Sequence, residues 1–394
     1  MIVGGIGTIE KRGANTWRIR LAIGKDPQTG KYRQKSRTVH GTKADAFRER
    51  EAMRRELEQG IRIDASKMTF SEYAEEFLRR RELKGAYKSV TLAGDRMHIR
   101  RLSSYLGGMR LREIDVSTIS YMQTRMIADG YTNTMMHSTM GKLRQMLREA
   151  VRLDFIATNP CDKIDIPRAG KHEMTTLDAE GIGRLLESLA THERRVEENP
   201  DAPLSRVLIE KARIAGVRLA LSTGMRRGEI LGLEWRNVNT EGRSIHIGQQ
   251  LTADRQIREP KTRSGIRSIS IDSATATYLE AWHHEQSTLL RRLGIEAQPQ
   301  TPIVSNSLGT FTDASNFSMW WAEFRDQYGF PNVRFHDLRH TQATLLIGNG
   351  VDIKTVQSRL GHSRAATTLD TYARALPEND RRAADLFGSL IDKA

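Results

Sequence analysis

The spacing of apolar residues changes along this chain, and the change constrains the fold more than any other feature. Near the N-terminus apolar and basic side chains alternate, with Trp17, Ile19 and Leu21 on one face, the period of two that is typical of a half-buried strand. Over residues 69–153 the apolar residues instead recur every three or four positions, as in amphipathic helices. From about residue 175 helical spacing returns, interrupted by short strand patterns. We therefore expect a multidomain, mainly α protein with small β-sheets.

Two segments rich in polar and turn-forming residues divide these patterns, one at residues 60–67 and the other at 166–171. The chain has 394 residues, enough for two or three domains. We expect an N-terminal three-stranded sheet plus a helix in residues 1–60 and a helical domain in 68–165. An α+β domain with a C-terminal helix is expected in residues 175–394.

Apolar stripes and capping residues predict the individual elements. Thr69 and Glu72 have the spacing of a capping box, which predicts a helix beginning at Thr69. Further helices are predicted over residues 43–59, 89–106, 116–129, 132–153, 178–190, 204–222, 226–233, 273–291, 313–328, 336–349, 352–360, 364–372 and 378–392. Strands are predicted over residues 244–248, 255–258 and 266–271; in the last of these Arg267, Ile269 and Ile271 alternate with serines.

Positive charge is concentrated near the N-terminus. The chain carries 62 Lys and Arg against 48 Asp and Glu, a net charge of +14, and residues 10–43 contribute ten cations against two anions. Along one predicted strand these cations recur every second residue, about 7 Å apart, close to the phosphate spacing of a nucleic-acid strand. Pairing such strands puts like charges side by side, which lowers stability unless an anion offsets them. We expect DNA phosphates to be bound by Arg18, Arg20, Lys31, Arg33, Lys35 and Arg37. The alternative is a solvated sheet face whose charges prevent edge pairing.

Several classes of protein are not expected. No apolar run reaches the ~18 residues of a membrane span, and the first residues do not resemble a secretory signal. Cys161 is the only cysteine, so we expect neither a disulfide nor a cysteine metal cluster. There is no phosphate-binding P-loop motif. His336 and His340 stand four apart, but the Glu of the zinc-protease helix motif is missing. We expect a cytoplasmic protein with no metal, no cofactor and no membrane segment.

Four segments of the predicted C-terminal domain stand out because they contain residue types that can carry chemistry. Each segment also has a simpler interpretation. The Arg that begins a helix would do no more than form an ion pair with a nearby Glu, and a Tyr at the end of an amphipathic helix is usually a packing residue. Composition alone would not select Tyr372 from the nine tyrosines. The segments are Thr223-Gly-Met-Arg226-Arg-Gly-Glu229, Pro260-Lys261-Thr-Arg-Ser-Gly-Ile-Arg267, His336-Asp-Leu-Arg339-His340, and Leu360-Gly-His362 with Tyr372 ten residues later.

Together and in this order, the four segments resemble the tyrosine recombinase (phage integrase) family, in its arm-binding, lambda-integrase-like branch. The three-domain layout is similar as well. The resemblance implies that the catalytic residues are Arg226, Lys261, His336, Arg339, His362 and the nucleophile Tyr372, with Glu229 supporting Arg226. Tyr372 is followed by Ala-Arg, where many relatives have Ala-His.

The chemistry explains why the family needs these residue types. A tyrosine has a pKa near 10, so roughly one in a thousand is ionised at neutral pH without help. Two guanidiniums stay charged and can clamp the oxygens of a phosphorus under attack. A lysine can protonate the leaving 5′ oxygen. Histidines titrate near neutrality and can orient the phosphate or hold a proton. A 3′-phosphotyrosine keeps the bond energy, so that the strand is rejoined without ATP.

The resemblance implies a site-specific recombinase that integrates or excises a phage or integrative element through a Holliday junction. It would act as a homotetramer on core and arm sites of double-stranded DNA in the bacterial cytoplasm. An excision factor and a host DNA-bending protein would be its accessory partners. The alternatives are a type IB topoisomerase, which shares this chemistry, and a non-catalytic DNA-binding regulator on the same scaffold. The final helix is expected to pack either on its own domain or on a neighbouring protomer.

Overall fold

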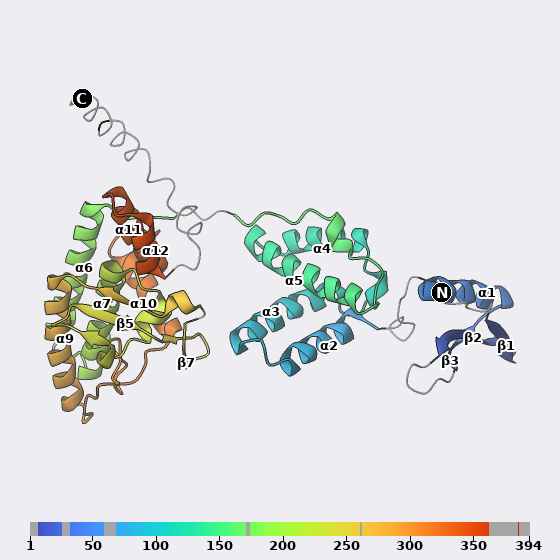
Figure 1. Cartoon of the computed structure of the whole chain (residues 1–394), viewed down its shortest axis with the longest axis horizontal. Helices are drawn as coiled ribbons and strands as arrows, with labels where there is room; N and C mark the ends of the chain where they lie inside the picture. Colours follow the sequence, from blue (N-terminus) through green and yellow to red (C-terminus); the bar gives the residue numbers. More distant parts are fainter. Residues whose placement is uncertain are drawn as a thin grey trace. The chain divides into compact units, whose positions relative to one another are not determined.

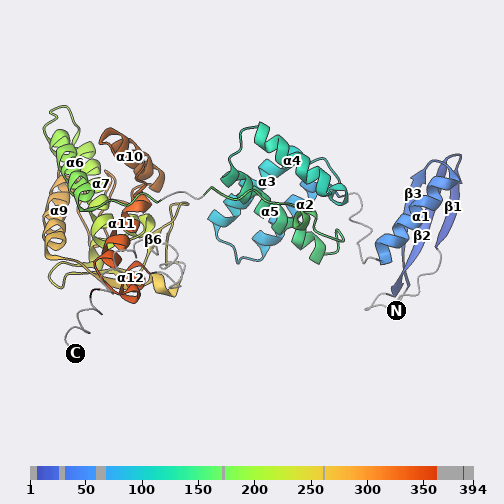
Figure 2. The same ribbon diagram turned by 90° about the horizontal axis from the view of Figure 1, so that it is seen from above.

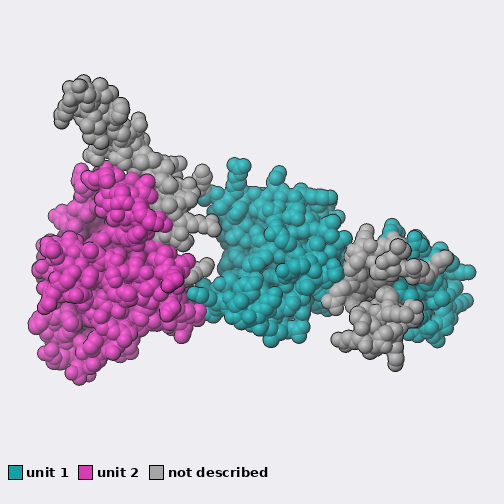
Figure 3. Space-filling view, viewed as in Figure 1, with its two compact units in different colours: residues 1–171 teal, residues 172–394 magenta. Residues whose placement is uncertain are grey.

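The chain forms two compact units, residues 1–171 and 172–394, which are coloured separately in Figure 3. The computed structural model describes residues 7–25, 32–58, 68–170, 174–260, 262–361 and 385. Its helices and strands are labelled in Figure 1. Among the helices in these ranges, none has both the length and the apolar composition that crossing a membrane requires.

The first unit begins with a three-stranded antiparallel sheet of order β1-β2-β3, as the alternation predicted. Its strands are β1 (Thr8–Gly13), β2 (Thr16–Lys25) and β3 (Tyr32–His40), and α1 (Lys43–Glu58) follows them. In Figures 1 and 2 α1 lies along one face of the sheet. A small core forms on that face from Ile9, Ile19, Leu21, Val39 and Met53.

Four helices make up the rest of the described first unit. They are α2 (Phe70–Leu83), α3 (Ser89–Leu106), α4 (Val116–Ala128) and α5 (Asn133–Arg152), with a 3₁₀ turn at Pro160–Lys163. Their buried aromatic, leucine and methionine side chains form a second hydrophobic core of their own. The methionine stripes in the sequence are therefore packing residues.

A capping box begins α2, as predicted. The Thr69 N–H donates to the Glu72 carboxylate at 2.8 Å, and the Glu72 N–H donates to Thr69 Oγ1 at 3.3 Å. These two bonds satisfy backbone donors that the first helical turn otherwise leaves without a partner.

In its described residues the second unit has a helical frame and two small antiparallel sheets, β4-β5-β8 and β6-β7. Its helices are α6 (Ala179–Glu197), α7 (Leu204–Thr223), α8 (Arg227–Leu231), α9 (Ser273–Arg292), α10 (Ala314–Gln327), α11 (Phe335–Gly348) and α12 (Ile353–Leu360). Its strands are β4 (Val238–Asn239), β5 (Ser244–Ile247), β6 (Gln250–Leu251), β7 (Ile257–Arg258) and β8 (Arg267–Ser270).

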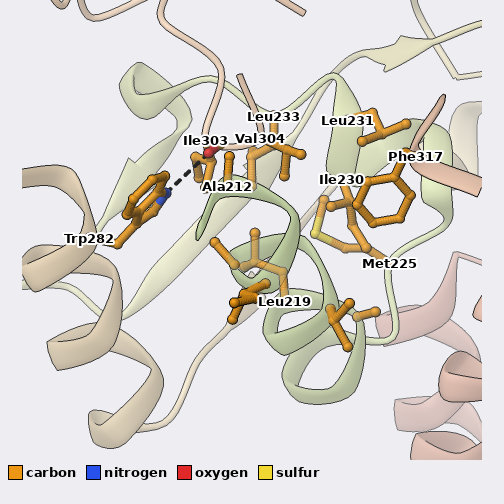
Figure 4. Close-up of a cluster of buried hydrophobic side chains, with 14 of the residues drawn as sticks. Ala212, Leu219, Met225, Ile230, Leu231, Leu233, Trp282, Ile303, Val304 and Phe317 are labelled. Atoms are coloured by element: carbon orange, nitrogen blue, oxygen red, sulfur yellow. Dashed lines mark hydrogen bonds between the residues drawn. The ribbon is translucent and has the colours of Figure 1, made fainter. Parts of the chain in front are cut away.

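Helix α7 runs through the core of this unit and leads directly into the segment that carries Arg226. Figure 4 shows Leu219 of α7, Met225 and Ile230 among the buried side chains of this cluster. On the far side, Trp282 Nε1 donates to the carbonyl of Ile303 at 3.1 Å. Because Met225 and Ile230 are buried on either side of Arg226, the backbone at Arg226 is anchored in the core.

Helix α6 extends seven residues beyond the predicted end at residue 190, to Glu197. Tertiary contacts explain the extension. Lys211 of α7 is 4% exposed, and its ammonium pairs with Glu193, Glu197 and Glu285. A buried ammonium needs such partners, so Lys211 ties α6 to α7 and α9.

Candidate active site

Arg226 precedes the short helix α8 and is held by Glu229 from the first turn of that helix. The backbone N–H of Arg226 donates to Glu229 Oε2 at 2.9 Å, and its Nη1 donates to Oε1 at 2.8 Å. Its Nη2 donates to the carbonyl of Gly361 at 3.0 Å. The Arg226 side chain is 37% exposed, so its guanidinium is fixed by the protein and still accessible to a ligand.

Gly224 makes the turn that brings Arg226 to this place. Its φ of +65° is in the left-handed region, which glycine adopts without steric cost. A Cβ at this position would overlap Gln342 Oε1 and lie 2.8 Å from Leu360 Cδ2. The backbone conformation therefore favours glycine here, and a larger residue would also have to displace the side chains of Gln342 on α11 and Leu360 on α12.

Arg339 lies on α11 and is almost completely buried, with 2% of its surface exposed. Its Nη1 donates to the carbonyl of Gly224 and its Nη2 to the carbonyl of Leu360, each at 2.6 Å. Arg226 and Arg339 therefore hold the same two segments, the turn after α7 and the C-terminal end of α12.

Arg267, which we did not predict as a site residue, donates four side-chain hydrogen bonds in this site. Its Nη1 and Nη2 donate to Glu229 Oε1 and Oε2 at 3.2 and 3.0 Å. Its Nε donates to the carbonyl of Arg359 at 2.7 Å and its Nη1 to that of Gly265 at 3.0 Å. The available signal was its alternation with Ile269 and Ile271, which places an arginine on the buried face of a strand.

Glu229 is 1% exposed and stays ionised between the two arginines. Burial by itself raises the pKa of a carboxyl group. Here the hydrogen bonds and charge of Arg267, followed by those of Arg226, outweigh burial and lower the pKa of Glu229. The carboxylate therefore acts as a permanent anion that orients both guanidiniums.

His336 and His340 lie one turn apart on α11, with their rings edge to face and their centroids 4.7 Å apart. Desolvation, followed by the charges of His340, Arg339 and Arg226, lowers the pKa of His336 to about 4. We expected a histidine titrating near neutrality. In the free protein His336 is instead neutral at pH 7, so its ring can accept a proton, and an anion bound beside it would raise its lowered pKa.

A cleft of about 580 Å³ opens beside Arg226 and His336. Tryptophan and alanine side chains from α10 line it, and its polar lining is largely cationic. The arginines that line it are Arg226, Arg227, Arg325 and Arg334. A cationic cleft next to two fixed guanidiniums is suited to an anionic ligand such as a phosphodiester.

The structure brings four of the seven predicted active-site residues together, namely Arg226, Glu229, His336 and Arg339. The other three, Lys261, His362 and Tyr372, lie outside the described residues. Predicted helices 364–372 and 378–392 lie there too, apart from the single described residue Asp385. Across the ranges that are described, no group of three or more His, Cys, Asp or Glu side chains could hold a metal ion.

On the N-terminal sheet, Arg18 and Arg20 lie on the face opposite α1. In the register of β2 and β3, Arg18 is opposite Thr38 and Arg20 is opposite Ser36. The expectation of like charges side by side across these strands is therefore wrong, because hydroxyl side chains occupy the cross-strand positions. Arg20 Nη2 lies 3.6 Å from Glu10 Oε2.

The register places Lys35 and Arg37 on the other face of the sheet, the one that α1 covers. Lys35 is opposite Leu21 and Arg37 is opposite Ile19, and both apolar residues belong to the core beneath α1. Arg37 pairs with Glu49 of α1. The predicted cations are thus divided between two faces of the sheet. Lys31 and the side chain of Arg33 lie outside the described residues.

Comparison with known proteins matches both units. The model of the phage integrase family matches residues 178–379, about half of the chain, and the phage integrase SAM-like domain matches residues 69–166. A tyrosine recombinase XerC-like protein of Caldanaerobacter subterraneus subsp. tengcongensis is 25% identical over 97% of this chain and 98% of its own length. The ICEBs1 integrase of Bacillus subtilis is 24% identical over 98% of this chain and 100% of its own.

Solved structures of similar fold include two integrases. The Tn1549 transposon integrase in complex with a circular intermediate DNA has a TM-score of 0.64 at 20% identity, covering 81% of this chain and 99% of that one. A lambda integrase tetramer bound to a Holliday junction has a TM-score of 0.54 at 18% identity, covering 91% of this chain and 96% of that one. These two similarities concern the fold.

Proposed function

Because the chain belongs to the phage integrase family, it is a site-specific DNA recombinase, and we propose that it cuts and rejoins DNA through Tyr372. The family matches favour recombination over a type IB topoisomerase or a non-catalytic regulator. The proposed substrate is double-stranded DNA at the attachment site of a phage or integrative element, inside a bacterial cell.

One observation carries the proposed roles of the arginines. Arg226 Nη2 binds the carbonyl of Gly361, and Arg339 Nη2 binds that of Leu360. Both guanidiniums are therefore assembled around the residues that immediately precede His362 in the chain. Their shared place beside one helix end would let both positive charges act on one bound phosphodiester, whose non-bridging oxygens gain negative charge under attack.

In the proposed reaction the Tyr372 oxygen attacks the phosphorus and the bond to the 5′ oxygen breaks. His336, neutral at pH 7, is the proposed acceptor of the phenol proton, with His362 as its partner in orienting the phosphate. Lys261 is the proposed donor of a proton to the leaving 5′ oxygen. The products are a 3′-phosphotyrosine and a free 5′-hydroxyl. Attack on the phosphotyrosine by a 5′-hydroxyl from another strand forms a new phosphodiester and releases the Tyr372 oxygen.

The direct test is to mix the protein with nicked duplexes tiled across the DNA beside its gene, with a chelator and without ATP. We expect a covalent protein–DNA adduct on a denaturing gel, with the DNA attached to the peptide that contains Tyr372. DNA binding without any adduct would contradict the proposal. Relaxation of supercoils without a paired-site product would instead favour the topoisomerase.

We further propose a division into an arm-binding domain (residues 1–60), a core-binding domain (68–165) and a catalytic domain (175–394). The separate hydrophobic cores of the sheet and of helices α2–α5 support the first boundary. The same proposal includes assembly of the chain into a tetramer on DNA and strand exchange through a Holliday junction. It also includes an excision factor and a host DNA-bending protein as partners. The lambda integrase tetramer of similar fold supports the assembly.

The sheet face opposite α1 is the proposed surface for arm DNA, with Arg18 and Arg20 on phosphates. Each phosphate contact changes the slope of log K against log salt by roughly 0.9. We therefore expect the double variant Arg18→Ala/Arg20→Ala to reduce the slope for arm-site binding by roughly 2. Filter binding between 50 and 300 mM salt measures it.

The matched control is Arg48→Ala on α1, whose side chain is 77% exposed and pairs with Asp45. We expect it to leave the slope unchanged. Deletion of residues 1–60 should abolish arm-site binding and preserve cleavage of core sites. An unchanged slope in the double variant would rule out this face as the DNA surface.

A further inference from the structure

We propose that Arg267 is a positioning residue for DNA cleavage: it balances the charge of Glu229, so that the charge of Arg226 stays available to the scissile phosphate. The inference rests on the proposed function of Arg226. Arg267 itself is largely shielded, with 8% of its side chain exposed, so its effect on DNA is indirect.

Arg226 and Arg267 each donate two hydrogen bonds to the carboxylate of Glu229, one to each oxygen. Oε1 accepts Nη1 of Arg226 at 2.8 Å and Nη1 of Arg267 at 3.2 Å. Oε2 accepts the backbone N–H of Arg226 at 2.9 Å and Nη2 of Arg267 at 3.0 Å. Arg267 therefore supplies the two-pronged partner, and Arg226 commits only one guanidinium nitrogen to this carboxylate.

The shared hydrogen bonding matters because it sets the net charge of the group formed by Arg226, Glu229 and Arg267. Arg226 and Glu229 alone would form a neutral pair, whereas with Arg267 the group carries a net charge of +1. Glu229 is 1% exposed, and charges interact far more strongly away from water. Without Arg267, the buried anion would cancel much of the attraction that Arg226 exerts on a phosphate.

Arg267 also fixes the acceptor of the other Arg226 bond. Its Nε donates to the carbonyl of Arg359 at 2.7 Å, two residues before Gly361, whose carbonyl accepts Arg226 Nη2. Gly361 has φ +67°, and a Cβ there would lie 2.9 Å from Arg267 Nη1. The same guanidinium thus holds the carboxylate and the helix end that orient Arg226.

The first experiment compares Arg267→Gln and Arg267→Lys with wild type on a nicked duplex, measuring the rate of adduct formation and the affinity for DNA. A residue that only positions a reacting group contributes less to the rate than one that donates to the reacting atoms directly. We therefore expect Arg267→Gln to cleave DNA on the order of 10- to 100-fold more slowly than wild type. DNA affinity should stay within about threefold, because Arg267 does not contact DNA. Lysine keeps the positive charge but lacks the planar pair of donors, so the cleavage rate of Arg267→Lys should lie between those of wild type and Arg267→Gln.

The matched control is Arg292→Gln, an exposed arginine at the end of α9, which should cleave at the wild-type rate. Circular dichroism checks that each variant is folded. If Arg267→Gln does not fold, Arg267→Lys takes its place in the second experiment.

The second experiment separates this electrostatic role from general destabilisation. It repeats the rates on a duplex whose scissile phosphate is a methylphosphonate, in which a methyl group replaces the charged oxygen. This substrate carries one negative charge fewer in both its ground state and its transition state. Because there is less negative charge to stabilise, the deficit of Arg267→Gln should shrink to less than about threefold. An equal deficit on both substrates would overturn the inference. A wild-type protein that forms no adduct on the normal phosphate would instead refute the proposed function.

Discussion

Replacing Tyr372 with phenylalanine is expected to abolish covalent attachment of the protein to DNA. The substitution removes one oxygen atom, the proposed nucleophile, and keeps the aromatic ring. Loss of a nucleophile costs roughly 10⁴-fold or more in rate, which places the remaining reaction below detection on a denaturing gel. Affinity for the nicked duplex should be nearly unchanged, because the arginines and the cationic cleft remain. Adduct formation and a gel-shift titration on the same duplex measure the two effects.

Tyr328→Phe is the matched control for Tyr372→Phe. It removes a phenol hydroxyl from the same unit, one that contacts His192 Nδ1 at 3.3 Å, and should leave the adduct intact. An adduct that survived in Tyr372→Phe would show that another residue is the nucleophile. The peptide carrying the DNA would then identify it by mass.

For Arg339→Ala we expect two large effects. Cleavage should slow by about 10²- to 10³-fold, the usual cost of removing one donor to a developing oxyanion. The second unit should also lose about 2–4 kcal/mol of unfolding free energy, because buried carbonyls lose their donors. Those carbonyls belong to Gly224 and Leu360, each 2.6 Å from an Arg339 nitrogen. Urea unfolding followed by tryptophan fluorescence measures the stability, since Trp235, Trp282, Trp320 and Trp321 all lie in this unit.

Arg339→Lys separates the two effects. Lysine keeps the positive charge, but it cannot donate in a planar fork to two carbonyls. It should therefore recover part of the cleavage rate and little of the stability. If folded Arg339→Ala cleaved at the wild-type rate, Arg339 would have only a structural role.

Local patterns predicted most of the helices closely. The predicted helix over residues 89–106 matches α3 (Ser89–Leu106), and the capping box at Thr69 begins α2. The predictions succeeded because a stripe repeating every three or four residues and a capping pair act within a few positions of the chain. Helix α6 ran past its predicted end because Glu193 and Glu197 pair with the buried Lys211 of α7, a contact that periodicity does not contain.

The N-terminal sheet, too, was predicted in part. Alternation predicted its strands and its buried residues Ile19 and Leu21. It did not predict that Arg37 lies opposite Ile19 while Arg20 lies opposite Ser36. Register is decided by the pairing of strands, and a shift of one residue would exchange the two faces.

The sequence by itself determined most of the helices, the concentration of positive charge and the four motifs that resemble the family, because all of these are short-range or linear patterns. Only the tertiary structure decided which groups hold Arg226, Glu229 and Arg339 in place, and that Arg267 completes their site. Arg267 lies 38 residues from Glu229 and 92 from Arg359 in the chain. Its role depends on a buried carboxylate and a helix end that meet only when β8, α8 and α12 pack together.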